Sequence, residues 1–153
     1  MTERQLDLLR RLSAQCARKE HCLADLRQKL LRSGLTHAEG EEVLARLRAD
    51  GFVDEARYAR AFVSDKYRFD RWGRVKIRHA LRQKGVGEDN IADALATIDE
   101  SEYLDALDAF LRGKCGGADF PHDYAARQKL ARAAAARGYE PHLVFSRLRM
   151  DDC

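Results

Sequence analysis

Basic and aromatic side chains are concentrated between Lys66 and Lys84. This stretch holds eight lysines and arginines and a single acidic residue, Asp70, and three aromatic residues are interleaved with the cations. Clustered cations attract phosphate groups or an acidic protein surface, and aromatic rings supply apolar anchors there. The alternative for any single charge is a solvated helix face. For the whole cluster we predict a surface that binds a polyanionic or acidic partner.

The remaining charges are segregated along the chain as well. Residues 86–111 contain eight acidic residues and no lysine or arginine, whereas 127–149 are again mainly basic, with Glu140 as the one acid. The formal net charge of +3 is therefore the sum of opposed blocks. Such banding favours a partner that is itself periodic and mixed in charge.

The usual catalytic and metal-binding patterns do not occur in this sequence. The cysteines form no C-x-x-C pair, the histidines are scattered, and no serine lies in a G-x-S-x-G motif. We therefore predict a protein that is not an enzyme and that needs no metal or cofactor, with reduced thiols. The cysteines and histidines are Cys16, Cys22, Cys115, Cys153, His21, His37, His79, His122 and His142.

Length and composition predict a folded, soluble chain. Its 153 residues are 45% hydrophobic and 35% charged, with only 2 prolines, which suits one ordinary globular protein. We found neither an apolar run of membrane-spanning length nor the apolar core of a signal peptide. We expect a cytoplasmic protein that does not bind membranes.

Start and stop signals predict an all-α fold of short helices. Thr2 with Gln5, and Thr36 with Glu39, have the spacing of capping boxes, and Asp54 is a predicted N-cap for a helix over about 55–69. Glycines are predicted to end helices, and prolines to occupy first turns. These residues are Gly34, Gly85, Gly138, Pro121 and Pro141.

An internal repeat organises these helices. A shift of 51 residues aligns apolar residues and Gly34 of the first copy with apolar residues and Gly85 of the second, and a further shift of 53 aligns Gly138 more sparsely. Each copy has the pattern of three helices. We predict three tandem three-helix repeats, over 1–50, 51–100 and 101–153, that form an elongated, curved helical array. The glycine-rich residues 113–117 are predicted to be a linker.

Three stretches resemble the bacterial RecX recombination regulators. These are RKEHCLADLRQKL (18–30), GFVDEARYARAFV (51–63) and RWGRVKIRHALRQKGV (71–86), and the likeness extends to the Arg137-Gly138-Tyr139 turn. Cys22 and Asp25 stand where the family pattern has serine and glutamate. Because a thiol is a poor acceptor, we predict a weak cap for that helix.

The resemblance implies a negative modulator of the RecA recombinase. Such a protein binds the RecA filament on single-stranded DNA and inhibits ATP hydrolysis, strand exchange and co-protease activity. We expect it to act as a monomer. The alternative is a module that binds single- or double-stranded DNA non-specifically and affects RecA by competition. The predicted contact residues are Arg57, Arg68, Arg71, Trp72, Arg74, Lys76, Arg78, Arg82 and Lys84.

Overall fold

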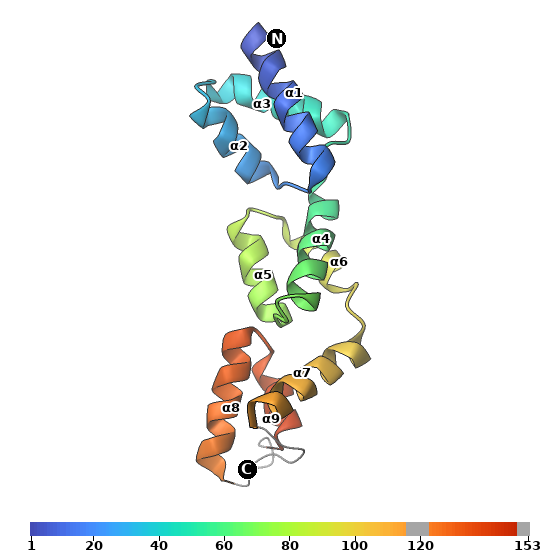
Figure 1. Cartoon of the computed structure of the whole chain (residues 1–153), viewed down its shortest axis with the longest axis vertical. Coiled ribbons are helices and arrows are strands. Elements are labelled where there is room, and N and C mark those ends of the chain that lie inside the picture. Colours follow the sequence, from blue (N-terminus) through green and yellow to red (C-terminus); the bar gives the residue numbers. More distant parts are fainter. Residues whose placement is uncertain (116–122, 150–153) are drawn as a thin grey trace. The chain divides into compact units, whose positions relative to one another are not determined.

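The computed structural model describes residues 1–115 and 123–149, and within these ranges it is helical without any strand (Figure 1). The all-α prediction is confirmed. The division into three three-helix repeats stays a prediction. The helices are α1 (Glu3–Arg18), α2 (Leu23–Arg32), α3 (His37–Ala49), α4 (Glu55–Arg68), α5 (Arg74–Gln83), α6 (Glu88–Leu95), α7 (Glu100–Cys115), α8 (Tyr124–Arg137) and α9 (Pro141–Arg147).

Side-chain caps begin the helices where the sequence predicts them. Both capping boxes form: Thr2 Oγ1 accepts from the Gln5 amide at 3.1 Å, and Thr36 Oγ1 from the Glu39 amide at 3.2 Å. Asp54 Oδ1 accepts from the Arg57 amide at 3.0 Å. Pro141 occupies the first turn of α9, while Pro121 lies outside the described residues.

The predicted weak cap of α2 is confirmed, and another residue compensates for it. Cys22 makes no capping hydrogen bond, but the Leu23 amide donates to Glu55 Oε1 at 2.8 Å. A carboxylate distant in sequence thus accepts a hydrogen bond from one of the amides that every helix start leaves unpaired.

The same glycine turn recurs three times. Gly34, Gly85 and Gly138 all have positive φ. In each case the amide of the following residue donates to a carbonyl five positions back, at 3.3 Å for Leu35, 3.1 Å for Val86 and 3.1 Å for Tyr139. This is the Schellman arrangement, in which a left-handed residue lets the chain return over the last helical turn.

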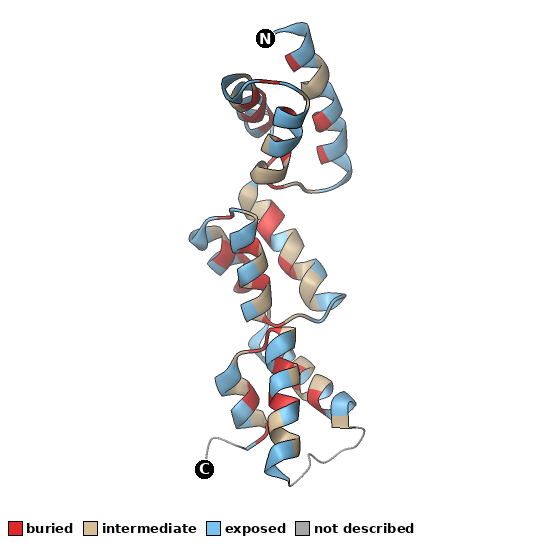
Figure 2. Cartoon of the chain, turned by 90° about the vertical axis from the view of Figure 1, so that its left-hand side faces the viewer, coloured by how far each residue is buried: buried red, intermediate tan, exposed pale blue. Residues whose placement is uncertain are grey.

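The chain divides into two compact units. The first unit is Met1–Phe62 with Leu81–Asp93, and the second is Val63–Ala80 with Ala94–Cys153. Figure 2 shows buried residues recurring along the helices. In the first unit Leu26, Leu30, Val43 and Leu47 are fully buried between α1, α2 and α3. In the second, the core is formed by residues of α7, α8 and α9, among them Tyr103, Leu107 and Leu111, together with Tyr139 of the turn between α8 and α9.

One sequence prediction is wrong in part. Residues Gly113 to Cys115 were expected in a linker, but they form the last turn of α7, while the following Gly116 and Gly117 lie outside the described residues. The helix continues because Leu107 and Leu111 anchor it to the core, which outweighs the low helix propensity of one glycine.

Candidate functional site

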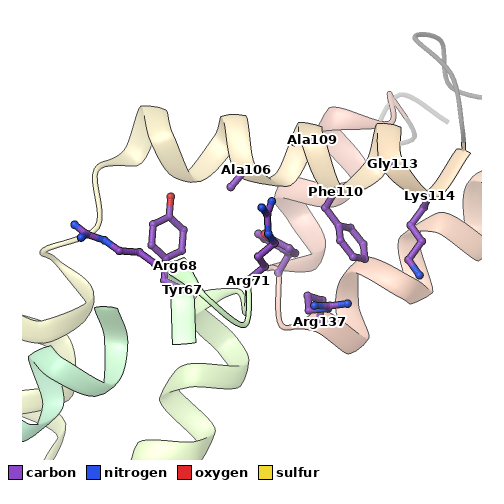
Figure 3. Close-up of a pocket in the computed structure, with 10 residues that line it drawn as sticks. Tyr67, Arg68, Arg71, Ala106, Ala109, Phe110, Gly113, Lys114 and Arg137 are labelled. Atoms are coloured by element: carbon purple, nitrogen blue, oxygen red, sulfur yellow. The ribbon is translucent and has the colours of Figure 1, made fainter. Parts of the chain in front are cut away.

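A hollow of about 550 Å³ lies in the second unit, and its walls carry cations and aromatic rings (Figure 3). We call it the basic–aromatic pocket. Its walls come from the end of α4 and the loop after it, from one face of α7, and from the turn between α8 and α9. The lining residues are Tyr67, Arg68, Arg71, Ala106, Ala109, Phe110, Gly113, Lys114, Arg137 and Tyr139.

Four of the lining residues are cations and none is acidic. Arg68, Arg71 and Lys114 are exposed, and none of the three forms an ion pair with a carboxylate of the described residues. Arg137 is partly buried and donates from Nη1 to the carbonyl oxygen of Asp70 at 3.0 Å, a bond that leaves its positive charge uncompensated. The pocket therefore presents net positive charge to solvent.

Aromatic rings form the inner surface of the pocket. The Phe110 ring centroid lies 5.9 Å from that of Tyr139, with the Arg137 guanidinium 5.3 Å and Lys114 Nζ 5.8 Å from the Phe110 centroid. Burial raises the pKa of Tyr67 and of Tyr139. Both phenols therefore stay neutral at physiological pH, so they do not offset the positive charge around them.

Two glycines hold the walls of the pocket together. The Gly73 amide donates to the Arg137 carbonyl at 3.0 Å, and the Val75 amide donates to the Gly138 carbonyl at 2.9 Å. A Cβ at Gly73 would overlap the Gly138 carbonyl, and one at Gly138 would overlap the Lys76 Cβ. The close approach requires both glycines. It fixes the loop that carries Arg71 against the turn that carries Arg137.

A network around Arg74 supports this crossing. The guanidinium lies 3.9 Å from the Tyr103 ring centroid, 2.6 Å from Glu140 Oε2 and 2.7 Å from Glu100 Oε2. The Arg74 amide donates to the Tyr103 hydroxyl at 2.9 Å, and that hydroxyl donates to Glu140. Burial disfavours the Arg74 charge, but the hydrogen bonds with Glu100 and Glu140 outweigh it and raise its pKa. The Arg74 guanidinium is thus already paired with carboxylates of the second unit.

Two lysines, Lys66 and Lys76, lie close to the Trp72 ring. Lys66 Nζ is 4.8 Å and Lys76 Nζ 4.5 Å from its ring centroid, and Lys66 also pairs with Asp70 at 3.0 Å. All three side chains are partly exposed, as is Arg78 on α5. These residues belong to the second unit, together with Arg68, Arg71 and Arg74.

The other three predicted residues belong to the first unit and form ion pairs there. Arg57 pairs with Glu20 at 2.5 Å, Arg82 with Glu88 at 2.5 Å and Lys84 with Asp25 at 3.2 Å. A cluster that is continuous in sequence is thus divided between the units. The part these residues play in binding stays a prediction.

Four residues of the pocket are absent from the contact residues predicted from the sequence: Phe110, Lys114, Arg137 and Tyr139. A signal for the α7 contribution exists, because Ala106, Phe110, Gly113 and Lys114 recur at helical spacing on one face. This signal was missed because residues 86–111 are acidic and because residues 113–117 were predicted to be a linker. The contribution of Arg137 depends on the crossing of two glycines far apart in sequence, which has no local signal.

Within residues 1–115 and 123–149, no group of three or more histidine, cysteine or acidic side chains could hold a metal ion. In the same ranges no helix is both long and apolar enough to cross a membrane.

Residues 54–95 match a family model described as RecX, second three-helix domain, so this part of the chain resembles a known helical domain. Regulatory protein RecX of Leptothrix cholodnii is 35% identical over 97% of this chain and 91% of its own length. Regulatory protein RecX of Pseudomonas fluorescens is 36% identical over 89% of this chain and 88% of its own length. The chain belongs to the RecX family.

Solved structures show the same fold. A crystal structure titled regulatory protein RecX matches 96% of this chain and 72% of its own with a TM-score of 0.80, at 22% identity. Another, of RecX from Lactobacillus salivarius, matches all of both chains with a TM-score of 0.82, at 13% identity. At these identities the match concerns the fold.

Proposed function

We propose that this chain is a negative regulator of the RecA recombinase. It binds the RecA filament on single-stranded DNA and slows ATP hydrolysis, strand exchange and co-protease activity. The observation that carries the proposal is membership of the RecX family along nearly the whole chain. It acts in the cytoplasm, as a monomer and without catalysis of its own, as one continuous unit of three three-helix repeats over 1–50, 51–100 and 101–153.

The second unit supplies the surface best suited to that role. Arg68 and Arg71 are exposed cations without an ion pair, whereas Arg74 is engaged with Glu100 and Glu140. Partner contacts depend on charges that the fold leaves available, since a cation already paired must break its own bonds first. We therefore place the RecA-filament contact at the basic–aromatic pocket.

Steady-state ATP hydrolysis by RecA on single-stranded DNA tests the proposal. Added protein is expected to lower the rate at or below one molecule per RecA protomer. The inhibition should weaken as salt rises, because exposed charges are screened. Unchanged hydrolysis at equimolar protein and low salt would overturn the proposal.

A further inference from the structure

We infer that the basic–aromatic pocket holds a single strand of nucleic acid, with phosphates on its cations and a base against its rings. The inference deepens the proposed function, on which it rests for the source of the strand, by naming the component of the filament that this site contacts. Two properties of the pocket support it: uncompensated charge, and an aromatic surface beside small residues.

The charge of the pocket is of the kind that tracks a phosphate backbone. Figure 3 shows the cations spread along the hollow, with Arg68 at one end and Lys114 at the other. Arginine presents several donors in a planar fork that matches two phosphate oxygens at once. Arg137 uses one of its donors on the Asp70 carbonyl, which leaves others for a ligand.

The shape of the pocket suits a flat ring. Ala106, Ala109 and Gly113 recur along α7 and leave space next to the Tyr67 and Phe110 rings. Bases stack on exposed aromatic side chains in proteins that bind single strands, and every base can do so. An acidic peptide would satisfy the cations but would give the rings no matching partner. The combination therefore favours nucleic acid over an acidic peptide.

The lining residues also predict how selective the pocket is. They include no asparagine, glutamine or carboxylate to pair with the edges of adenine or cytosine, and we assign the arginines and the lysine to phosphates. Binding should therefore depend on salt and hardly on sequence.

Fluorescence anisotropy of a labelled thymidine 20-mer, without RecA, tests the inference. The variant Arg71→Gln/Lys114→Gln removes two exposed charges of the pocket. Arg32→Gln/Arg48→Gln removes two exposed charges of the first unit and is the matched control. Each lost phosphate contact should make the slope of log K against log salt less negative by about 0.7, so the pocket variant should bind about 25-fold more weakly at 0.1 M salt. The control should bind like the unchanged protein.

A third variant, Phe110→Leu, separates stacking from charge. It should weaken binding about tenfold with the salt slope unchanged, because it removes a ring and no cation. Circular dichroism and urea unfolding establish that each variant is folded. Arg71→Gln/Lys114→Gln does not touch the core, so it keeps the test decisive if Phe110→Leu unfolds.

Two outcomes would overturn the inference: the oligonucleotide does not bind, or the pocket variant binds it as tightly as the control variant does. In the first case, pocket-dependent binding of a ten-glutamate peptide would identify an acidic peptide as the occupant. If RecA hydrolysis is still inhibited in either of these cases, the proposed function stands and only the inference fails. If pocket-dependent binding occurs without inhibition of RecA, the proposed function fails and the inference stands.

Discussion

Gly73 and Gly138 pack backbone against backbone, although they lie far apart in sequence. The Gly73 amide is bonded to the carbonyl of Arg137 at 3.0 Å, and neither glycine has room for a side chain. This crossing joins the loop after α4 to the turn after α8. The pocket exists because these two segments meet on the face of α7 that carries Phe110.

Gly73→Ala should therefore destabilise the second unit. The added methyl group overlaps backbone, which cannot rotate away, so we expect a loss of about 2–3 kcal/mol in the free energy of unfolding. Urea unfolding followed by the fluorescence of Trp72, the chain's one tryptophan and the neighbour of Gly73, measures it. Gly87→Ala is the control, because a Cβ there meets nothing within 4 Å. Equal stability of the two variants would contradict the account.

Arg74 should contribute to stability, and Arg82 should not. Arg74 and Glu140 are 19% and 18% exposed, whereas Arg82 and Glu88 are 54% and 62% exposed. Arg74→Gln leaves the Glu140 carboxylate without its cation and removes the guanidinium from the Tyr103 ring, and it should cost about 2–3 kcal/mol. Arg82→Gln should leave the urea midpoint unchanged, since exposed ion pairs contribute little. A similar midpoint shift for both variants would be evidence against this assignment.

The buried tyrosines should make stability fall at alkaline pH. Burial raises the pKa of Tyr58, Tyr67, Tyr103 and Tyr139, and for Tyr103 the bond to Glu140 adds to the effect. The folded chain keeps these protons where the unfolded chain, with tyrosine pKa values near 10, releases them. Stability is thus fully present below about pH 10 and is lost as pH rises beyond it.

Absorbance at 295 nm measures this directly. Four of the five tyrosines should stay protonated above pH 10 until the chain unfolds, and Tyr103→Phe should reduce that number to three. In urea all should ionise together. A folded-state curve that coincides with the one in urea would refute the prediction.

Phe69 should matter for the partner and not for the fold. Its side chain is 79% exposed directly between Arg68 and Asp70, in the segment that leads into the pocket wall. Phe69→Gln should leave the urea midpoint unchanged. It should raise the concentration needed to inhibit RecA about tenfold, as the loss of an aromatic anchor does. Leu31→Gln in the first unit, 38% exposed, is the matched control and should inhibit normally.

Local signals predicted the helices well. Thr2, Thr36 and Asp54 cap helices because a cap depends on residues three positions apart, which the sequence displays. The glycine turns were predictable for the same reason. The last turn of α7 was not, since Gly113 is held in the helix by core contacts of Leu111 that only the tertiary structure provides.

The candidate site was predicted in part. Arg68 and Arg71 stood out because they are close together in a basic stretch, and both line the pocket. Charge density alone could not separate them from Lys84, whose partner Asp25 lies 59 residues away. Whether a cation is available or paired depends on tertiary contacts, and so does the meeting of Arg71 with Arg137.

The third glycine turn leaves less space for a side chain than the second. At Gly85 a Cβ would meet nothing nearer than 4.0 Å, so only the left-handed backbone limits the residue, and asparagine satisfies that limit. Gly138 has the same backbone requirement and also lacks any volume for a side chain. The same turn therefore tolerates asparagine at Gly85, where it only reverses the chain, and no side chain at Gly138, where it packs against Gly73 and Lys76.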